Sequence, residues 1–291
     1  MRLSLIFQIG CILVLISTAC TPLSQESPVP IMTDSLPTPS LTVTPSPTAP
    51  LAPLATVSDL GSQSVIDGAE MVYIPAGVYG WGVQQEELEG FWIDKYEVTN
   101  TLFRKFMEAG GYQNRDYWSE TGWDWLQSQG IAQPLYWEDE RFNNPQQPVV
   151  GISWYEADAY ARWAGKRLPT VTEWQAAAQG TDNRVWPWGN EWDPAKANAG
   201  DGSQGAPVDV GSYPAGVSPL GVLDMAGNVW EYTLDWYLLR AGSNDHTYCA
   251  TLSSSWDVSF SQEQFCNEHR THSFGRYPSG GFRTAKDDNK P

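Results

Sequence analysis

The stretch on which the fold depends reads Gly221-Val222-Leu223-Asp224-Met225-Ala226-Gly227-Asn228-Val229-Trp230-Glu231-Tyr232. Its apolar side chains belong in a core, yet Asp224, Asn228 and Glu231 are interleaved among them. Charged side chains are rarely buried unless they are paired or bind a metal. The stretch therefore indicates either a ligand site or a structured turn.

Both interpretations are open from the residues alone. Asp224, Glu231 and the carbonyls of Gly227 and Val229 would supply the oxygen ligands that a hard cation such as Ca2+ prefers. Alternatively, the Asp and Asn side chains bond to their own backbone in a turn that precedes an edge strand. Spacing favours the turn, because the pattern is not that of an EF-hand loop.

The N-terminus predicts export. Arg2 is followed by an apolar run from Leu3 to Ala19, which has the length of a signal peptide and is short for a spanning helix. The run ends in Ser17-Thr18-Ala19-Cys20, which resembles the lipobox of bacterial lipoproteins. We therefore expect residues 1–19 to be removed, and Cys20 to carry lipid and anchor the protein to a membrane of the bacterial envelope. An ordinary cleaved signal peptide is the alternative.

Composition divides the rest of the chain. Residues 20–64 are rich in Pro, Thr and Ser, which predicts a disordered tether, because such a segment buries too little apolar surface to offset its ordering entropy. Residues 65–286 are long enough for one domain with its own core, and 287–291 form a tail. The net charge of -17 argues against nucleic acid as a partner.

The cysteines predict one disulfide. Cys11 leaves with the signal peptide and Cys20 carries lipid, so Cys249 and Cys266 remain. Two cysteines in an exported protein most simply pair with each other.

Helix signals are clear at three places. Thr99 is a candidate N-cap for an amphipathic helix ended by Gly110 and Gly111. Capping boxes begin at Ser153 and Thr170, each with a glutamate three residues later. Short strands are expected within 71–82, 91–98 and 207–214. Together these elements predict an irregular α+β domain.

Two further segments leave alternatives open. Residues 112–148 form a long stretch, predicted to be irregular, whose tryptophans either cover the core or contact a carbohydrate or peptide. The loop with Asn198 and Asp201 holds either cation ligands or ordinary turn formers.

The motifs occur in an order that resembles the formylglycine-generating enzyme family, also called the sulfatase-modifying factor domain. The segments that carry the resemblance are Met71–Gly77, Tyr96–Asn100, Pro148–Trp154, Gly165–Thr170, Trp188–Asn190, Asp224–Glu231 and Gly281–Arg283. The resemblance covers residues 68 to 286 and implies a loop-rich, C-type-lectin-like fold with bound calcium. One calcium is implied at Asp224 and Glu231, with the carbonyls of Gly227 and Val229. A second calcium is implied at Asn198 and Asp201, with the carbonyls of Ala199 and Ser203.

Catalysis is a separate question. The resemblance implies copper bound by two thiols, but their positions are occupied here by Val258 and Glu263. Neither side chain replaces a thiolate, which Cu(I) requires. The motif that precedes them reads Ser253-Ser254-Ser255-Trp256, with serines in place of glycines. Copper-dependent formylglycine generation is therefore not expected.

Two readings of the function remain. A metal-dependent oxidase acting on a cysteine or small thiol could hold copper, or iron through Cys266, His269 and His272, whose spacing would place them on one helix face. Trp230 and Ser255 are further candidate catalytic residues in that reading. The other reading is a binding scaffold with a cleft near Trp230 and Trp256, whose ligand is a protein, peptide or glycan.

Overall fold

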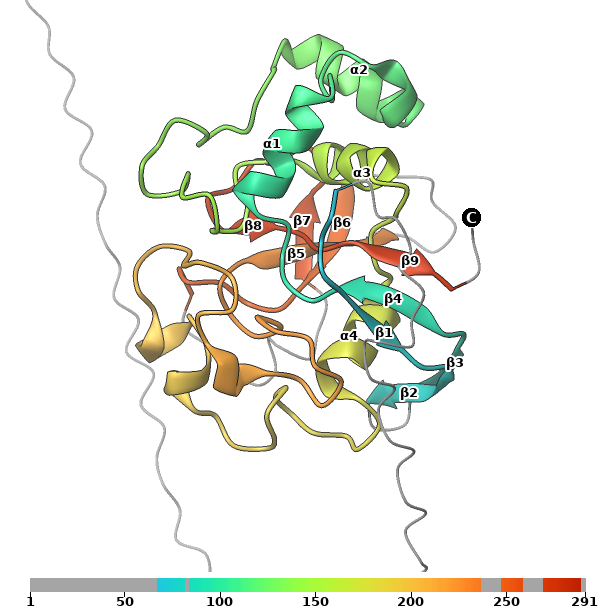
Figure 1. The fold of residues 1–291 in the computed structure, drawn as a ribbon, viewed down its shortest axis with the longest axis vertical. Coiled ribbons are helices and arrows are strands. Elements are labelled where there is room, and N and C mark those ends of the chain that lie inside the picture. The colour runs from blue at the N-terminus through green and yellow to red at the C-terminus, as the bar shows by residue number, and fades with distance from the viewer. Residues whose placement is uncertain (1–66, 82–83, 237–246, 259–268, 289–291) are drawn as a thin grey trace, which may run out of the picture. The chain divides into compact units, whose positions relative to one another are not determined.

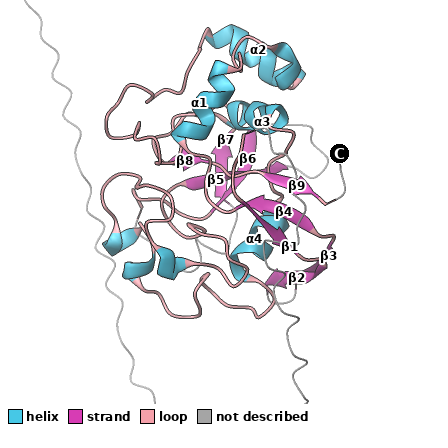
Figure 2. Cartoon of the chain, in the orientation of Figure 1, coloured by secondary structure: helices cyan, strands magenta, loops and turns pink. Residues whose placement is uncertain are grey.

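The structure is a computed structural model (Figure 1). It describes residues 67–81, 84–236, 247–258 and 269–288. The predicted signal peptide, tether and tail end lie outside these ranges, as do Cys20, Glu263 and Cys266. Among the described residues, no helix has the length and apolar character needed to cross a membrane. Short helices and strands are joined by long loops, as expected for an irregular α+β domain (Figure 2).

The largest sheet has the strand order β7-β6-β5-β8. Its strands are β5 (Trp230–Trp236), β6 (Tyr248–Leu252), β7 (His269–His272) and β8 (Gly280–Gly281). β5 pairs antiparallel with β6 and parallel with β8. The stretch 221–232 therefore leads into an interior strand, and the expectation of an edge strand is wrong.

A second sheet joins the two ends of the domain. β1 (Met71–Ile74), β4 (Phe91–Asp94) and β9 (Ala285–Asp287) pair antiparallel in the order β1-β4-β9. β2 (Gly77–Trp81) and β3 (Gln84–Leu88) form a separate two-stranded sheet. The strand predicted at 91–98 ends at Asp94. The N–H of Val98 donates to the carbonyl of Phe282, which lies before β9 and outside the ladder of β4.

The predicted helix starts are confirmed. α1 (Asn100–Glu108) is capped by the Thr99 side chain, which accepts from the Leu102 N–H. α3 (Trp154–Trp163) and α4 (Val171–Gln179) begin with the complete capping boxes of Ser153 and Thr170. These helices were predictable because each cap is a contact between residues three apart.

Two expectations about connecting segments are wrong. Residues 112–148 contain α2 (Glu120–Gln129), which Ser119 caps and Gly130 ends in a left-handed conformation. The strand expected at 207–214 does not form, because the N–H of Val208 donates to a side chain, Asn228 Oδ1, at 2.9 Å. Short 3-10 helices occupy other described connections: η1 (Arg115–Tyr117), η2 (Pro194–Lys196), η3 (Gly200–Gly202) and η4 (Pro214–Gly216).

The core lies in two main clusters. One contains Phe103, Tyr160 and Phe282 and packs α1 and α3 over the large sheet, with α2 beyond them (Figure 1). The other packs Trp174 of α4 against Met225 of the stretch 221–232. The tryptophans Trp118 and Trp137 of the 112–148 segment are buried in the first cluster, which supports the interpretation that they cover the core.

A buried ion network ties the beginning of the described chain into this core. The Nζ of Lys166 lies 2.9 Å from Asp67 and 2.8 Å from Asp94, and the side chains of Lys166 and Asp67 are fully buried. Tyr160 also donates to Asp67 at 2.8 Å. The network thus connects three parts of the domain: its first described residue, Asp67, the end of β4 at Asp94, and the turn after α3 at Lys166.

Candidate functional site

The stretch 221–232 is built from two left-handed turns that precede β5. Asp224 has φ 57° and Asn228 has φ 64°, which is the region that Asn and Asp tolerate better than other L-residues. Gly227 has φ 88°, and a Cβ at this position would lie 2.8 Å from the carbonyl oxygen of Asn198. The turns leave Asp224, Asn228 and Glu231 buried.

Glu231 is paired with a buried arginine. Arg283 donates its Nε and one Nη to the two carboxylate oxygens of Glu231, at 2.7 and 2.8 Å. The other guanidinium N–H groups donate to the carbonyls of Asp94, Lys95 and Leu223. Trp174 adds a bond to Glu231 at 2.8 Å. Burial by itself would lower the pKa of Arg283. The negative charge of Glu231 more than offsets this effect, so the net pKa is raised and the arginine stays charged.

Asp224 and Glu97 form a second, unbalanced part of this cluster. Asp224 accepts from the Gly211 N–H at 2.6 Å, and Glu97 accepts from the Asn228 side chain at 3.1 Å. The other oxygen of Glu97 is buried without a described partner. Burial raises the pKa of Asp224 to about 6, and burial and the neighbouring Asp224 raise the pKa of Glu97. The cluster thus has more carboxylates than Arg283 can neutralise.

The loop of the second predicted calcium site lies against the second of these turns, at Gly227 and Asn228. The Asn198 amide donates to the Ala206 carbonyl at 2.9 Å and accepts from the Gln204 N–H at 2.9 Å. The Asn198 side chain is therefore bonded within the protein, whereas Asp201 is exposed on η3. Ala199 is buried, and the Ser203 hydroxyl bonds the Trp256 carbonyl. The structure brings Asn198 to Asn228 but does not bring Asp201 to it.

Both calcium sites stay predictions. Among the described residues, no three Asp, Glu, His or Cys side chains are arranged to hold a metal ion. The carboxylates of Asp224 and Glu97 nevertheless fit a cation, because they are buried with excess negative charge and Glu97 borders a cavity of about 320 Å3. Glu231, in contrast, is already engaged by Arg283 and Trp174.

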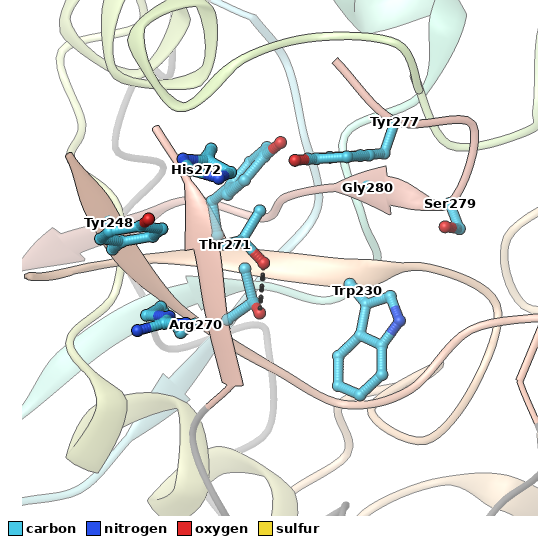
Figure 3. Close-up of a pocket in the computed structure, with 10 residues that line it drawn as sticks. Trp230, Tyr248, Arg270, Thr271, His272, Tyr277, Ser279 and Gly280 are labelled. Atoms are coloured by element: carbon cyan, nitrogen blue, oxygen red, sulfur yellow. Dashed lines mark hydrogen bonds between the residues drawn. The ribbon is translucent and has the colours of Figure 1, made fainter. Parts of the chain in front are cut away.

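A cavity of about 380 Å3 opens on the large sheet (Figure 3). Its described lining consists of Trp230, Tyr232, Tyr248, Thr251, Arg270, Thr271, His272, Tyr277, Ser279 and Gly280. Tyr248, Arg270 and His272 lie on one side of the view in Figure 3, and Trp230, Tyr277 and Ser279 on the other. The predicted cleft therefore includes Trp230. Trp256 lies outside this lining and packs against Phe142.

The placement of His269 and His272 on one helix face is wrong, and a metal site at these residues stays a prediction. His269 and His272 lie in the strand β7, where residues three apart point to opposite faces of the sheet. The His269 ring lies 4.7 Å from Trp230, and the His272 ring lies 4.5 Å from Tyr248 and 4.9 Å from Phe274. Cys266 lies outside the described residues, so its part in any site stays a prediction.

Cys249 is a buried free thiol. It lies on β6 with its Sγ 3.5 Å from the Thr271 carbonyl, and burial raises its pKa to about 12. Such a thiol stays protonated at neutral pH, whereas metals and electrophiles react with the thiolate. Because Cys266 is not described, the disulfide between the two stays a prediction.

The serine motif is packed away from solvent. Ser253, Ser254 and Ser255 are fully buried, and the Ser255 hydroxyl bonds the Asp257 carboxylate. Val258 occupies one position at which the resemblance implies a copper thiol, and its carbonyl accepts from the Gly200 N–H at 3.2 Å. The described residues of this motif therefore make hydroxyl and backbone hydrogen bonds within the protein, to Asp257 and Gly200.

Sequence reasoning missed several residues of both sites. Glu97 and Arg283 lie within the family motifs, but the motifs alone indicate no role for them, since their partners lie far away in the chain. Tyr248, Arg270 and Tyr277 carried no motif at all. An unpaired charge in an apolar context was the available signal for Glu97.

Comparison with known proteins agrees with this architecture. A family model described as sulfatase-modifying factor enzyme 1-like domain matches residues 56–288. The hercynine oxygenase of Mycolicibacterium thermoresistibile is 40% identical over 162 residues, covering 50% of this chain and 36% of that protein. The formylglycine-generating enzyme of Mus musculus is 32% identical over 224 residues, covering 59% of each. This chain thus spans only 36 to 59% of the length of these curated relatives.

Solved structures show the same fold. PvdO from Pseudomonas aeruginosa has a TM-score of 0.58 at 23% identity, covering 76% of this chain and 95% of that one. Treponema denticola variable protein 1 has a TM-score of 0.54 at 19% identity, covering 75% of this chain and 95% of that one. The chain therefore belongs to the sulfatase-modifying factor enzyme 1-like domain family and has its loop-rich, C-type-lectin-like α+β fold.

Proposed function

We propose that this chain is an envelope-anchored, calcium-stabilised binding protein that uses the family fold without the copper-thiol oxidase. The absence of a usable thiol from the described part of the site carries this proposal. The described lining of the cavity contains no cysteine, and Val258 occupies one of the implied copper positions. The described thiol, Cys249, is buried and protonated. A site without thiolates has poor affinity for Cu(I).

A metal-dependent oxidase acting on a cysteine or small thiol is the second candidate. The 32% identity with a protein named formylglycine-generating enzyme favours it. Cys266 could supply one thiolate, but the implied copper site needs two, and Cys249 is confined to the interior of the large sheet. Binding is therefore the function that the described residues support better.

Titration with Cu(I) under anaerobic conditions separates these candidates. The purified protein is titrated in competition with a chromogenic Cu(I) chelator, and thiols are counted before and after reduction. We expect no stoichiometric copper binding, because the described site lacks a pair of accessible thiolates. One tightly bound copper per chain, lost in Cys266→Ser and retained in Cys249→Ser, would support the oxidase instead.

Calcium stabilisation is proposed for the Asp224–Glu97 side of the buried cluster. The two carboxylates would hold the ion, with the carbonyls of Gly227 and Val229 as neutral ligands. A divalent cation would neutralise the excess negative charge that burial makes costly. Glu231 would not be a calcium ligand in this arrangement. Its hydrogen bonds to Arg283 would instead hold β5, the strand that follows the turn, in place.

The envelope location rests on the N-terminal sequence. If Cys20 carries lipid, the protein should partition with membranes, and Cys20→Ala should release it into the soluble fraction. Fractionation followed by immunoblotting measures this. An alanine variant that remains with the membranes would show that another segment anchors the protein.

A further inference from the structure

The cavity of about 320 Å3 lies beside the segment that joins β4 to α1 (Figure 1). Three of its described lining residues are acidic, namely Glu70, Asp94 and Glu97, and none is Lys, Arg or His. Glu70 and Gln146 of the lining are exposed and mark its open end, whereas Glu97 is 1% exposed and marks its inner end. A cleft lined by one sign of charge concentrates ligands of the opposite sign. The lining thus selects a cationic ligand.

Glu97 differs from the other two acidic residues of the lining. Each of those two pairs with a lysine at 2.8 Å, whereas Glu97 has no ion pair among the described residues. Its Oε1 accepts from the Asn228 amide at 3.1 Å, and its Oε2 is buried without a described hydrogen-bond partner. A buried carboxylate without a partner is costly, and a nearby cation relieves that cost. Glu97 therefore offers a ligand one acceptor oxygen at the inner end of the cavity.

A single available oxygen favours one kind of cation. A guanidinium binds a carboxylate most strongly through two parallel hydrogen bonds, which need both oxygens, and Oε1 of Glu97 already accepts from Asn228. A primary ammonium is a compact charge with three N–H donors, so it can bind one oxygen. A quaternary ammonium carries the charge but has no N–H donor. The primary ammonium is therefore the cation that fits Glu97.

The rest of the lining suits an alkyl chain. Leu102 and Val210 are half-buried in the lining and supply apolar surface. A volume of about 320 Å3 falls within the usual range of small-molecule sites, so there is room for more than the charged group. An aliphatic stem that ends in an ammonium packs along apolar surface while its charged end makes polar contacts.

We propose that this cavity binds a primary alkylammonium group, carried by a lysine side chain or by a free aliphatic amine. The ammonium donates to Oε2 of Glu97 at the inner end, and the alkyl stem packs against Leu102 and Val210. This inference rests on the proposed binding function and names its ligand class. Calcium at Asp224 and Glu97 would take up the same negative charge, so calcium should weaken the binding of the ammonium.

The test compares ligands that differ at the cationic group. Nα-acetyl-lysine methylamide, its Nε-trimethyl form and Nα-acetyl-arginine methylamide are titrated into the purified protein by calorimetry, in EDTA and in a buffer without primary amines. We expect the lysine derivative to bind about 10- to 100-fold more tightly than the other two, which is the range of one hydrogen bond to a charged group. All three carry the same charge, so the general attraction to a chain of net charge -17 cancels.

A fourth ligand, n-butylamine, separates the two sources of the ammonium. It has the lysine side chain without the peptide groups. Binding as tight as that of the lysine derivative would identify a free amine as sufficient, and clearly weaker binding would identify a lysine in a peptide.

Two glutamine variants of the same cavity test the role of Glu97. Glu97→Gln should weaken the lysine derivative about 10- to 100-fold and remove its advantage over the trimethyl form. Glu70→Gln is the matched control and should change the affinity less than about 5-fold, because the Glu70 side chain is 61% exposed and paired with Lys95. Thermal melting shows whether each variant is folded, and the ligand series on the parent decides the matter if Glu97→Gln does not fold.

The outcomes separate this inference from the function on which it rests. Equal binding of the lysine and trimethyl derivatives, no binding of either amine, or equal losses in Glu97→Gln and Glu70→Gln would overturn the ammonium site and leave a binding protein. Unchanged affinity in calcium would remove calcium from Glu97 and leave the ammonium site in place. Stoichiometric copper with thiol-dependent oxygen consumption would overturn the binding function itself.

Discussion

Replacement of Arg283 by methionine is expected to lower the free energy of unfolding by about 3–5 kcal/mol. Arg283 is fully buried and pairs with Glu231 through two hydrogen bonds of 2.7 and 2.8 Å. Methionine removes the guanidinium and leaves the Glu231 charge buried without its cation. Urea unfolding followed by tryptophan fluorescence measures the change.

Two variants determine whether the buried charge is the cause. The double variant Arg283→Met/Glu231→Gln should recover part of the loss, since it no longer contains the unpaired charge. Arg141→Met should cost at most about 1 kcal/mol, because its pair with Asp139 is largely exposed. Equal losses for Arg283→Met and the double variant would show that packing, and not charge, dominates.

The second large effect concerns Asp224, calcium and pH. Asp224 has a pKa of about 6 in the folded protein, above its usual value of 3.8. The folded state therefore binds more protons than the unfolded state between these values, and stability falls as pH rises through this range. A shift of this size corresponds to about 3 kcal/mol. Without calcium, Asp224→Asn should be more stable than the parent at pH 7 by up to that amount.

Calcium should reverse this order. The parent should gain about 2.7 kcal/mol at a calcium concentration one hundred times its Kd, and Asp224→Asn should gain little, because it lacks the carboxylate. The measurement is the urea unfolding free energy in EDTA and in calcium, at pH 4 to 7. The advantage of Asp224→Asn in EDTA should shrink as the pH falls below 6.

Asp201→Asn is the control for this experiment. Asp201 is the exposed acid of the second predicted site, and its removal should leave the calcium response intact if the ion binds at Asp224. A response lost in Asp201→Asn and kept in Asp224→Asn would place the ion in the other loop. An identical unfolding curve with and without calcium would contradict calcium stabilisation altogether.

Local contacts were predictable from the sequence, and distant ones were not. The caps at Thr99, Ser153 and Thr170 were found because side chain and backbone donor lie three residues apart. Helix α2 was missed because its residues Glu120–Gln129 mix Trp, Gln, Ser and Gly without a strong apolar stripe. The strand expected at 207–214 failed because its backbone donors bond to Asn228 and Asp224 from another turn.

The candidate site was predictable only in its motifs. Asp224, Asn228 and Glu231 stood out as polar residues in an apolar stretch, and the structure confirms that they are buried. Their partners Glu97 and Arg283 required the tertiary fold, since Asn228 and Glu97 are 131 residues apart. A spacing of three between His269 and His272 is compatible with one helix face, but the same residues form the strand β7, and sequence alone does not distinguish the two.

Oxygen consumption tests the central claim, a binding protein without the copper-thiol oxidase, most directly. The purified chain is supplied with Cu(I) and a cysteine-containing peptide in an oxygen electrode, with a protein-free sample as the reference. The account predicts a rate no higher than that of the reference, because Val258 and the buried Cys249 leave copper without its thiolate pair. A rate that saturates with peptide concentration and disappears in Cys266→Ser would contradict it.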